Sequence, residues 1–238
     1  MPADGIAVLN DDFEYIADHP VSGVKNVFRY SLENKGSDYY AGDICYGVNS
    51  TEFTVTGKTG CSHNFITKLV GSCNISNLLA AVIVAEKLGV DYQSAKLAVS
   101  QIEQVEHRLN LKHTGAGITI IDDAFNSNPH GAAMALEVIS RFTSGRRIVV
   151  TPGMIELGDK QHHHNREFGR RMADSCDYAV IVGSYNREAI LAGLREAGFP
   201  EENIYQASDF ADATGRLKQI VQSGDVILYE NDLPDTFK

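Results

Sequence analysis

Several features that mark other classes of protein are missing from this sequence. Its four cysteines are widely spaced and form no C-x-x-C pair, which argues against a disulfide framework or a zinc site and indicates a reduced compartment. The first residues have neither the basic segment nor the apolar core of a signal peptide. No apolar run approaches the roughly 18 residues of a membrane helix. We therefore expect a soluble, cytoplasmic protein without membrane insertion.

Positive charge is scarce as well. The 238 residues contain 21 Lys and Arg against 31 Asp and Glu, a net charge of −10, and no basic cluster. Nucleic acid is therefore not an expected partner, because binding to phosphate backbones needs a basic surface. The hydrophobic fraction of 43% provides enough apolar side chains for one large domain or two of ordinary size.

The first part of the chain is rich in strand and turn patterns. Strands are expected at 6–9, 24–30, 43–48, 52–56 and 65–70. The last two flank a turn at 57–60 and predict an antiparallel hairpin. Apolar residues at helical spacing then predict a helix capped by Asn74 and ended by Gly89, and a second one capped by Asp91.

From about residue 105 strand and helix patterns alternate. Strands are expected at 118–121, 147–151, 178–182, 204–206 and 226–229, and helices near 129–141, 160–175, 186–197 and 208–222. Such alternation is typical of βαβ units around a mainly parallel sheet. The sequence therefore predicts two domains, residues 1–104 and a Rossmann-like α/β domain at residues 105–238.

The most informative segment follows the apolar strand at 118–121. Asp122 and Asp123 come next, then Asn126 and Asn128, and Pro129 opens an alanine-rich helix. Acids and amides at the carboxyl end of a buried strand, beside a helix N-terminus, lie where α/β proteins bind nucleotides or phosphates. The alternative is an ordinary connection in which Asp and Asn serve as turn and cap residues.

Three other motifs carry less information. Gly57-Lys58-Thr59 resembles the end of a phosphate-binding loop, but Glu52 stands where that motif needs its first glycine, so a hairpin turn is expected. The three histidines at 162–164 point about 100° apart on a helix and cannot converge on one ion, which favours a solvated face. Gly183 ends a strand before a helix and fits either an anion site or a sharp turn.

Two asparagines and an arginine also have two interpretations. Asn74 and Asn77 lie at a helix start, where Asn74 is a cap in one interpretation and the amide of Asn77 contacts an adenine edge in the other. Arg108, just before the α/β part, is either a surface residue or a phosphate clamp.

In combination and order these segments resemble the Mur ligase family, ATP-dependent enzymes that add amino acids to the peptidoglycan precursor. The segments are Gly71 to Asn77 with Leu-Leu-Ala-Ala (G-x-H-N-x-x-N-x-x-A-A in the family), Glu106 to Leu109, Asp122 to Pro129 (D-D-x-Y-N-A-N-P) and Pro152 to Gly158 (G-D-M-x-E-L-G). The last two are most similar to the member that adds D-alanyl-D-alanine. The resemblance extends from Gly5 to about Tyr229.

The sequence departs from the family pattern at several positions. Cys73 and Asn165 replace histidines, and Gly153 replaces an acid. Residues 229–234 stand where related ligases have a basic K-G-S-R or K-G-H-E segment. The 238 residues contain no phosphate-binding loop with its lysine and no D-N-P-R motif. By resemblance, the chain is the C-terminal part of a ligase and lacks the nucleotide-sugar domain, the loop and the magnesium-binding residues.

The resemblance implies amide-bond formation through an acyl phosphate, with ATP and Mg as cofactors of the parent enzyme. Asn74 and Asn77 would contact adenine, Arg108 the phosphates and Asp123 the ribose, with Arg108 and Asp123 as catalytic residues and no metal ligand in this chain. The partners would be a nucleotide-sugar peptide and an amino acid or dipeptide. Substrate-binding residues would be Asn126, Asn128, Glu230, Asn231 and Asp232. We expect the last three to favour an amine or neutral amide over a carboxylate.

A hypothesis from another class is a non-catalytic module that kept the Mur ligase fold and binds a nucleotide or a partner. The missing phosphate-binding loop favours this module for the chain as it stands, whereas the set of Asn77, Arg108 and Asp123 favours a part of a working ligase.

Overall fold

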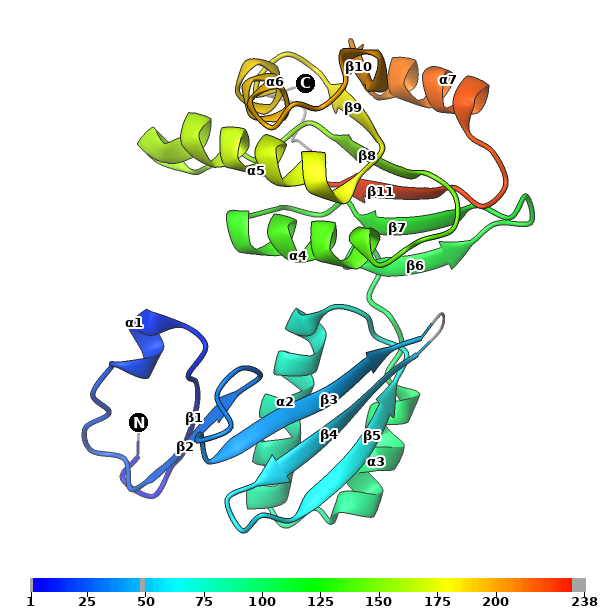
Figure 1. Cartoon of the computed structure of the whole chain (residues 1–238). Coiled ribbons are helices and arrows are strands. Elements are labelled where there is room, and N and C mark those ends of the chain that lie inside the picture. The colour runs from blue at the N-terminus through cyan, green and yellow to red at the C-terminus, as the bar shows by residue number, and fades with distance from the viewer. Residues whose placement is uncertain (1, 48–49, 233–238) are drawn as a thin grey trace. The chain divides into compact units, whose positions relative to one another are not determined.

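The computed structural model describes residues 2–47 and 50–232, which fold as two compact units with a division between Glu103 and Gln104 (Figure 1). Each unit has its own sheet, of five strands in unit 1 and six in unit 2. Over the described ranges, no helix is long and apolar enough to cross a membrane.

Unit 1 is a mixed sheet with helices on one face. Its elements are β1 (Ile6–Asn10), α1 (Glu14–Ala17), β2 (Asn26–Ser31), β3 (Tyr39–Tyr46), β4 (Thr51–Gly57), β5 (Ser62–Thr67), α2 (Ser72–Lys87) and α3 (Tyr92–Gln101). The strands lie in chain order, parallel from β1 to β3 and antiparallel from β3 to β5. Alternate residues of β4, such as Phe53 and Val55, are buried, and they share one core with Ile75 and Leu79 of α2.

The structure confirms the hairpin and corrects other details of unit 1. The Gly57 to Gly60 turn joins β4 to β5, so Gly57-Lys58-Thr59 is a hairpin turn. Asp91 caps α3, because its carboxylate accepts from the Gln93 and Ser94 amides. Asn74 does not cap α2. The helix begins at Ser72 after Gly71, whose φ of 89° favours glycine.

Two further differences concern strand and helix limits in unit 1. The strand expected at 43–48 is β3 at Tyr39–Tyr46, because Tyr39 and Tyr40 extend the sheet by pairing with the end of β2. Val48 lies outside the described residues. The short helix α1 has only four residues and no buried side chain, so it left no periodic pattern in the sequence.

Unit 2 alternates strands and helices. Its elements are β6 (Asn110–His113), β7 (Thr119–Asp123), α4 (Pro129–Ser140), β8 (Arg147–Thr151), η1 (Gly158–Lys160), α5 (Gln161–Ser175), β9 (Tyr178–Val182), α6 (Arg187–Glu196), η2 (Glu201–Asn203), β10 (Ile204–Ala207), α7 (Phe210–Ile220) and β11 (Val226–Glu230). The sheet order is β10-β9-β8-β11-β7-β6, with β6 antiparallel and the other strands parallel.

The parallel strands of unit 2 are buried on both faces. Val150 and Val180 pack with Leu217 of α7, while the intervening Val149 and Ile181 are also fully buried. This two-sided burial explains the nearly continuous apolar strand sequences. The structure thus confirms the Rossmann-like prediction for this unit. The strand β6 was not predicted, because Asn110, Lys112 and His113 leave little apolar alternation in an edge strand.

Candidate functional site

The candidate site of unit 2 lies at the carboxyl edge of its sheet. Asp123 ends β7, Thr151 ends β8 and Glu230 ends β11. These strands are parallel neighbours, and Glu230 is in register with Asp123. The loops that leave them therefore meet at one edge, where open α/β sheets bind their ligands.

The two adjacent aspartates have different surroundings. Asp122 is buried and accepts hydrogen bonds from Lys112 Nζ at 2.7 Å and His107 Nδ1 at 3.0 Å. Burial alone would raise the pKa of Asp122, but these two bonds outweigh it and hold the pKa below its usual value. Burial raises the pKa of Asp123, which the amide of Leu109 and the charge of Arg108 offset only in part.

Arg108 lies beside the loop that follows β7. One Nη donates to the Asn126 carbonyl oxygen at 3.3 Å, and the guanidinium lies 4.7 Å from the centre of the Phe125 ring. The side chain is otherwise exposed. The structure thus brings together Arg108, Asp123 and Asn126, three residues singled out in the sequence, and leaves the arginine with further donors for an anion.

Asn126 and Asn128 have distinct positions in this loop. Asn126 is exposed and adopts a φ of 52°. Asn128 is the N-cap of α4, where its Oδ1 accepts from the amides of His130 at 3.1 Å and Gly131 at 2.9 Å. The cap interpretation therefore holds for Asn128, and its side-chain oxygen is already engaged by the helix.

Glu230 is not a surface residue. Its side chain is fully buried and accepts hydrogen bonds from Thr151 Oγ1 at 2.7 Å and from Ser127 Oγ. Burial raises the pKa of Glu230 to about 7, although both hydroxyls lower it. The carboxyl thus ties the loop after β7 to the end of β8. The expected contact of Glu230 with a substrate stays a prediction, and its side chain is not exposed in this structure.

The next two residues differ in exposure. Asn231 is buried, has a φ of 63°, and donates from Nδ2 to the Gly153 carbonyl oxygen at 2.6 Å. Because asparagine tolerates this left-handed conformation, it can stand where the family pattern has a glycine. Asp232 is exposed. Of the three tail residues singled out, only Asp232 is exposed.

A buried amide network holds the loop after β8. Asn165 of α5 accepts from the Met154 amide at 2.8 Å and donates to the Met154 carbonyl at 2.9 Å, while Asn186 donates to the Pro152 carbonyl at 3.0 Å. A Cβ on Gly153 would lie 2.5 Å from Asn165 Oδ1. The departures at 153 and 165 therefore occur at one place. The main chain of the loop satisfies the side-chain amide of Asn165, which is fully buried.

Residues in the left-handed region gather around this edge. Among the described non-glycine residues six have positive φ, and five of them are in unit 2: His107, Leu109, Asn126, Glu156 and Asn231. Each such residue costs on the order of 1 kcal/mol or more, and such strain is concentrated at functional sites. Gly183 also has a positive φ, but its amide donates to the Ala207 carbonyl at 3.0 Å, which fits a sharp turn.

Unit 1 contains its own candidate group at the carboxyl end of β1. Asn10 Nδ2 donates to Ser76 Oγ at 3.1 Å and so joins this strand to the first turn of α2. In that turn Asn77 is exposed, while Asn74 Nδ2 donates to the Val70 carbonyl at 2.7 Å. The two asparagines proposed for adenine thus stand on either side of Ser76 in the sequence, and Ser76 contacts the carboxyl end of the parallel strand β1. Open α/β sheets bind their ligands at such strand ends.

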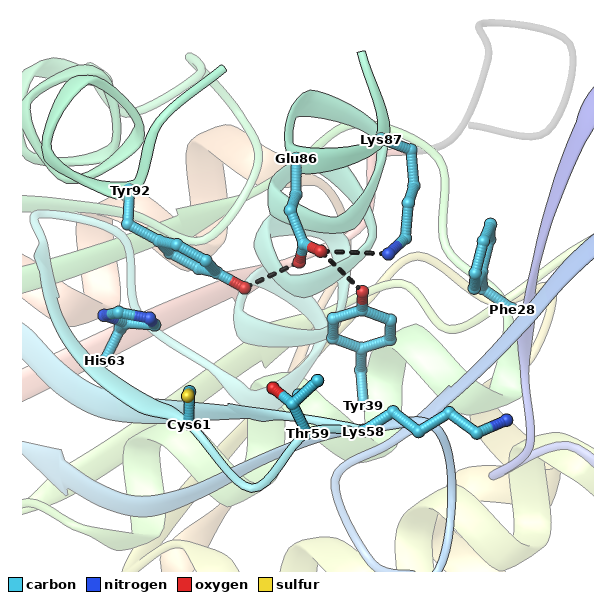
Figure 2. A pocket seen from close by; sticks show the side chains of 10 residues that line it. Phe28, Tyr39, Lys58, Thr59, Cys61, His63, Glu86, Lys87 and Tyr92 are labelled. Atoms are coloured by element: carbon cyan, nitrogen blue, oxygen red, sulfur yellow. Dashed lines mark hydrogen bonds and ion pairs between the residues drawn. The ribbon is translucent and has the colours of Figure 1, made fainter. Parts of the chain in front are cut away.

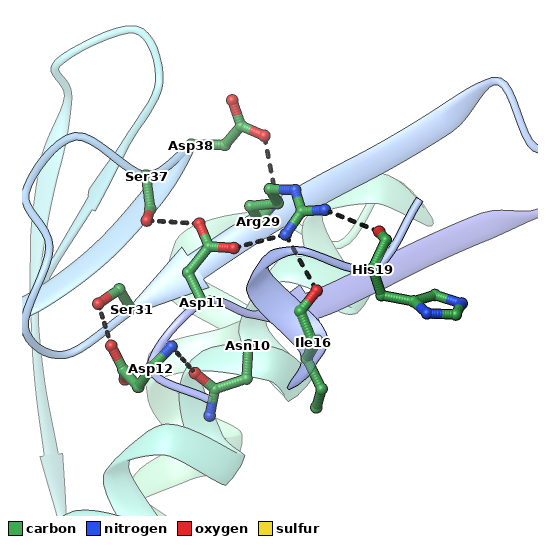
Figure 3. Close-up of polar contacts among 9 residues, drawn as sticks. All are labelled: Asn10, Asp11, Asp12, Ile16, His19, Arg29, Ser31, Ser37 and Asp38. Atoms are coloured by element: carbon green, nitrogen blue, oxygen red, sulfur yellow. Dashed lines mark hydrogen bonds and ion pairs between the residues drawn. The ribbon is translucent and has the colours of Figure 1, made fainter. Parts of the chain in front are cut away.

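A network of carboxylates fixes the loops beside this group (Figure 3). Asp11 accepts from Arg29 at 2.7 Å and from Ser37 at 2.8 Å, and Asp12 accepts from Ser31 and from the Leu32 amide. All four oxygen atoms of the two aspartates thus serve the loops that leave β1 and β2. No role for Asp11 and Asp12 could be predicted from the sequence, since their partners are 18 to 26 positions away.

A cavity of about 390 Å³ lies at the other end of α2 (Figure 2). Glu86 accepts there from Tyr39 at 3.0 Å, Tyr92 at 2.6 Å and Lys87 at 2.9 Å. Burial would raise the pKa of Glu86, but these three bonds hold it below its usual value. Lys58 of the hairpin turn lines the same cavity but is paired with Asp38 at 2.8 Å. The charge of Glu86 is thus satisfied by three other side chains that line this cavity.

Family models match both units. The model described as "Mur ligase middle domain" matches residues 1–85, and the one described as "Mur ligase, glutamate ligase domain" matches residues 107–229. The second match alone covers more than half of the chain. The chain belongs to the Mur ligase family.

Individual relatives agree with this assignment. The UDP-N-acetylmuramoyl-tripeptide--D-alanyl-D-alanine ligases of Bacillus subtilis and Escherichia coli are 24% and 28% identical, over 91% and 95% of this chain. The match covers 47% and 48% of those proteins, so the chain spans about half their length. The crystal structure of the MurF ligase from Thermotoga maritima in complex with ADP matches with a TM-score of 0.80 at 22% identity, over 97% of this chain and 50% of that one.

Proposed function

We propose that this chain forms the middle and C-terminal part of an ATP-dependent amide ligase of peptidoglycan precursor synthesis, of the type that adds D-alanyl-D-alanine. Residues 1–104 would be a partial middle domain without the phosphate-binding loop, and residues 105–238 the C-terminal ligase domain. The observation that carries the proposal is the grouping of Arg108, Asp123 and Asn126 at the carboxyl edge of a parallel sheet.

The residues at this edge fit a nucleotide. Arg108 uses one donor for the Asn126 carbonyl and is exposed, so its guanidinium retains donors for phosphate oxygens. The Leu109 amide bonds to Oδ1 of Asp123, which leaves Oδ2 for a ribose hydroxyl. By resemblance Asn77 would contact adenine, and ATP with Mg would supply the phosphoryl group that activates a substrate carboxylate. Arg108 and Asp123 would hold and orient these groups.

The remaining site residues divide into two groups. Asn126 and Asp232 are exposed and would contact the peptide or the incoming amine. Asn128, Glu230 and Asn231 hold the loops in place through the cap, hydroxyl and carbonyl contacts described above. The substrates of the parent enzyme would be a nucleotide-sugar peptide and an amino acid or dipeptide.

The second candidate is a non-catalytic module that binds a nucleotide or partner with the same fold. Its support is the absence of a G-x-x-x-x-G-K-[ST] loop from the 238 residues. The coding sequence upstream of Met1 separates the two. A continuous reading frame with that loop supports the ligase, and a genuine start codon supports the module.

Activity of the natural gene product provides the direct test. With Mg-ATP, a UDP-muramoyl tripeptide and D-alanyl-D-alanine, we expect phosphate release that needs both substrates. Arg108→Ala should lower kcat about 100-fold, as loss of a charge-stabilising donor does, while Arg195→Ala, on an exposed pair with Glu201, should not. Equal rates for both variants would refute the role of Arg108.

Nucleotide binding by the 238-residue chain is a separate test. Because no phosphate-binding loop is present, calorimetry with Mg-ATP should detect weak binding or none. Submicromolar affinity would show that the chain contains another phosphate site.

A further inference from the structure

Arg108 stands between two residues with unusual backbone conformations. His107 has a φ of 59° and Leu109 a φ of 48°. This left-handed region is rare for non-glycine residues, and each such residue costs on the order of 1 kcal/mol or more. The turn that contains them is closed by the Arg108 amide, which donates to the Val105 carbonyl oxygen at 3.1 Å. Contacts of the turn with the rest of unit 2 must offset this strain.

Two consecutive aspartates hold the two strained residues. Nδ1 of His107 lies 3.0 Å from Oδ1 of Asp122, and the Leu109 amide donates to Oδ1 of Asp123 at 3.0 Å. Although burial raises it, hydrogen bonds from two side chains hold the pKa of Asp122 below its usual value, so at neutral pH its carboxylate accepts and His107 Nδ1 donates. Neighbouring strand residues point to opposite faces. The two carboxylates therefore hold the turn from both faces of β7, one on each side of Arg108.

The sheet topology brings this turn to the carboxyl end of β7. The edge strand β6 begins at Asn110 and is antiparallel to β7, with Asn110 opposite Asp122. The residues just before β6 consequently lie beside the last residues of β7. The Leu109 side chain is buried, and the Leu111 amide donates to Oε1 of Gln104 at 2.8 Å. The position of the turn is therefore set by contacts within unit 2.

The contacts of the Arg108 side chain itself are weak. Its hydrogen bond to the Asn126 carbonyl oxygen is 3.3 Å long, slightly beyond the usual range. Its guanidinium lies 4.7 Å from the centre of the Phe125 ring, and an exposed contact of this kind contributes about 0.5 to 1 kcal/mol. These contacts alone fix a long side chain poorly. The direction of the arginine therefore depends on the main chain at 107–109.

We propose that Asp122, acting through His107, is a positioning residue for Arg108. The inference rests on the proposed ligase function, in which Arg108 contacts phosphate oxygens, and it gives Asp122 a role that this function did not include. Asp122 and His107 do not touch the nucleotide in this arrangement. They hold the main chain in the conformation from which the guanidinium reaches the carboxyl edge of the sheet.

Three variants separate the hydrogen bond from the backbone conformation. Asparagine adopts positive φ more readily than most residues, and its Nδ2 is as many bonds from Cα as Nδ1 of histidine, so His107→Asn should keep both features. His107→Gly keeps the conformation accessible but removes the donor. Lys112→Met is the matched control, because it removes the other partner of Asp122, at 2.7 Å, and leaves His107 in place.

The first measurement is nitrogen-15 NMR of the Arg108 Nε–H group in the 238-residue chain. The wild type, His107→Asn and Lys112→Met should show one ordered resonance, shifted by the Phe125 ring, whereas His107→Gly should show the resonance of a mobile arginine. The amides of β8 and β9 should be unchanged throughout, since the His107 side chain is 48% exposed.

Three NMR results would overturn the proposal. The first is an unchanged Arg108 resonance in His107→Gly. The second is an equal change in Lys112→Met. The third is loss of the β8 and β9 spectrum in His107→Gly, because residue 107 would then serve the fold of the unit rather than the position of Arg108.

The second measurement is kcat/KM for Mg-ATP with the natural gene product. His107→Gly should lower it about 10-fold, less than Arg108→Ala does, because a displaced group loses only part of its effect. In the Arg108→Ala background, His107→Gly should have no further effect, since its action depends on the guanidinium. An equal 10-fold loss in that background would overturn the proposal. If no variant and not even the wild type releases phosphate, the ligase function fails, whereas the NMR result still decides whether Asp122 and His107 position Arg108.

Discussion

Two glutamates, one in each unit, show how differently the same side chain behaves in two polar networks. Glu86 in unit 1 and Glu230 in unit 2 each accept hydrogen bonds from two hydroxyl groups. Glu86 also accepts from Lys87 and retains 29% exposure, whereas Glu230 is fully buried beside Asp123. The pKa of Glu86 is therefore lowered and that of Glu230 raised to about 7. Two hydroxyl groups do not offset full burial, but two hydroxyls and a cation offset partial burial.

The two networks consequently respond to pH with opposite signs. Because the folded pKa of Glu230 exceeds its ordinary 4.5, its unit loses stability as pH rises from about 4.5 to about 7. Because the folded pKa of Glu86 lies below 4.5, its contribution is present above that pH and is lost as pH falls through the folded pKa. A test of either residue therefore needs a pH series rather than a single condition.

The largest expected effect concerns Glu230→Gln. The rise from 4.5 to about 7 corresponds to about 3 kcal/mol of stability lost by the wild type across that range, at about 1.4 kcal/mol per pKa unit. The variant has no ionisable group there, so its unit 2 should keep that stability and exceed the wild type at pH 8. Hydrogen exchange of the β8 and β11 amides measures the opening free energy of this unit.

Glu202→Gln, on an exposed residue, is the control and should follow the wild type. If the profiles of Glu230→Gln and the wild type stay parallel from pH 4 to 8, the contrast between the two glutamates is wrong.

These networks also mark the limit of what the sequence could predict. The alternation of strand and helix patterns correctly predicted the Rossmann-like unit, because each strand and helix there is specified by neighbouring residues. Asp123 could be singled out because it follows a predicted strand, and Arg108 because it precedes the α/β part; their roles stay predictions. The burial of Glu230 could not be predicted, because it depends on Ser127 and Thr151, which are 103 and 79 residues away.

The burial of Asn165 could not be predicted from neighbouring residues either. Between three histidines and an arginine it looked like part of a polar face, yet it is fully buried. Its amide is satisfied by the main chain of Met154, a contact that local periodicity cannot reveal. One signal of this burial was present in the sequence, because Gly153 and Asn165 both depart from the family pattern. Two changes at positions that are in contact suggest that they share an environment.

A smaller effect is expected from Tyr92→Phe in unit 1. The change removes one donor to the Glu86 carboxylate but keeps the ring that stacks on His63. A hydrogen bond to a charged, partly buried group contributes about 1 to 2 kcal/mol. Exchange of β4 and β5 amides at pH 7 should show this loss, which should shrink as Glu86 becomes protonated.

Tyr205→Phe is the matched control, since Tyr205 donates at 2.7 Å to Asp212, a half-buried carboxylate whose pKa is lowered mainly by hydrogen bonds, with burial a smaller influence than at Glu86. Its effect on unit 2 should be smaller, because water replaces that bond. A loss as large as that of Tyr92→Phe would mean that burial does not distinguish the two carboxylates.

The smallest effect on stability, and the sharpest test of the contrast, is expected from Lys87→Met. Methionine keeps the apolar stem beside Phe28 and Tyr39 but removes the cation, so Glu86 is left with hydroxyl donors alone, as Glu230 is. The pKa of Glu86, followed by carbon-detected NMR of its carboxyl, should rise relative to the wild type. Partial exposure should keep that rise smaller than the one at Glu230. The accompanying loss of stability should stay below about 1 kcal/mol at pH 7, as for other partly exposed pairs.

The control Lys87→Arg keeps the charge and should leave the pKa of Glu86 low. If Lys87→Met does not raise it, the two tyrosines alone hold the carboxylate ionised, and the opposite behaviour of Glu230 then follows from its burial and from Asp123.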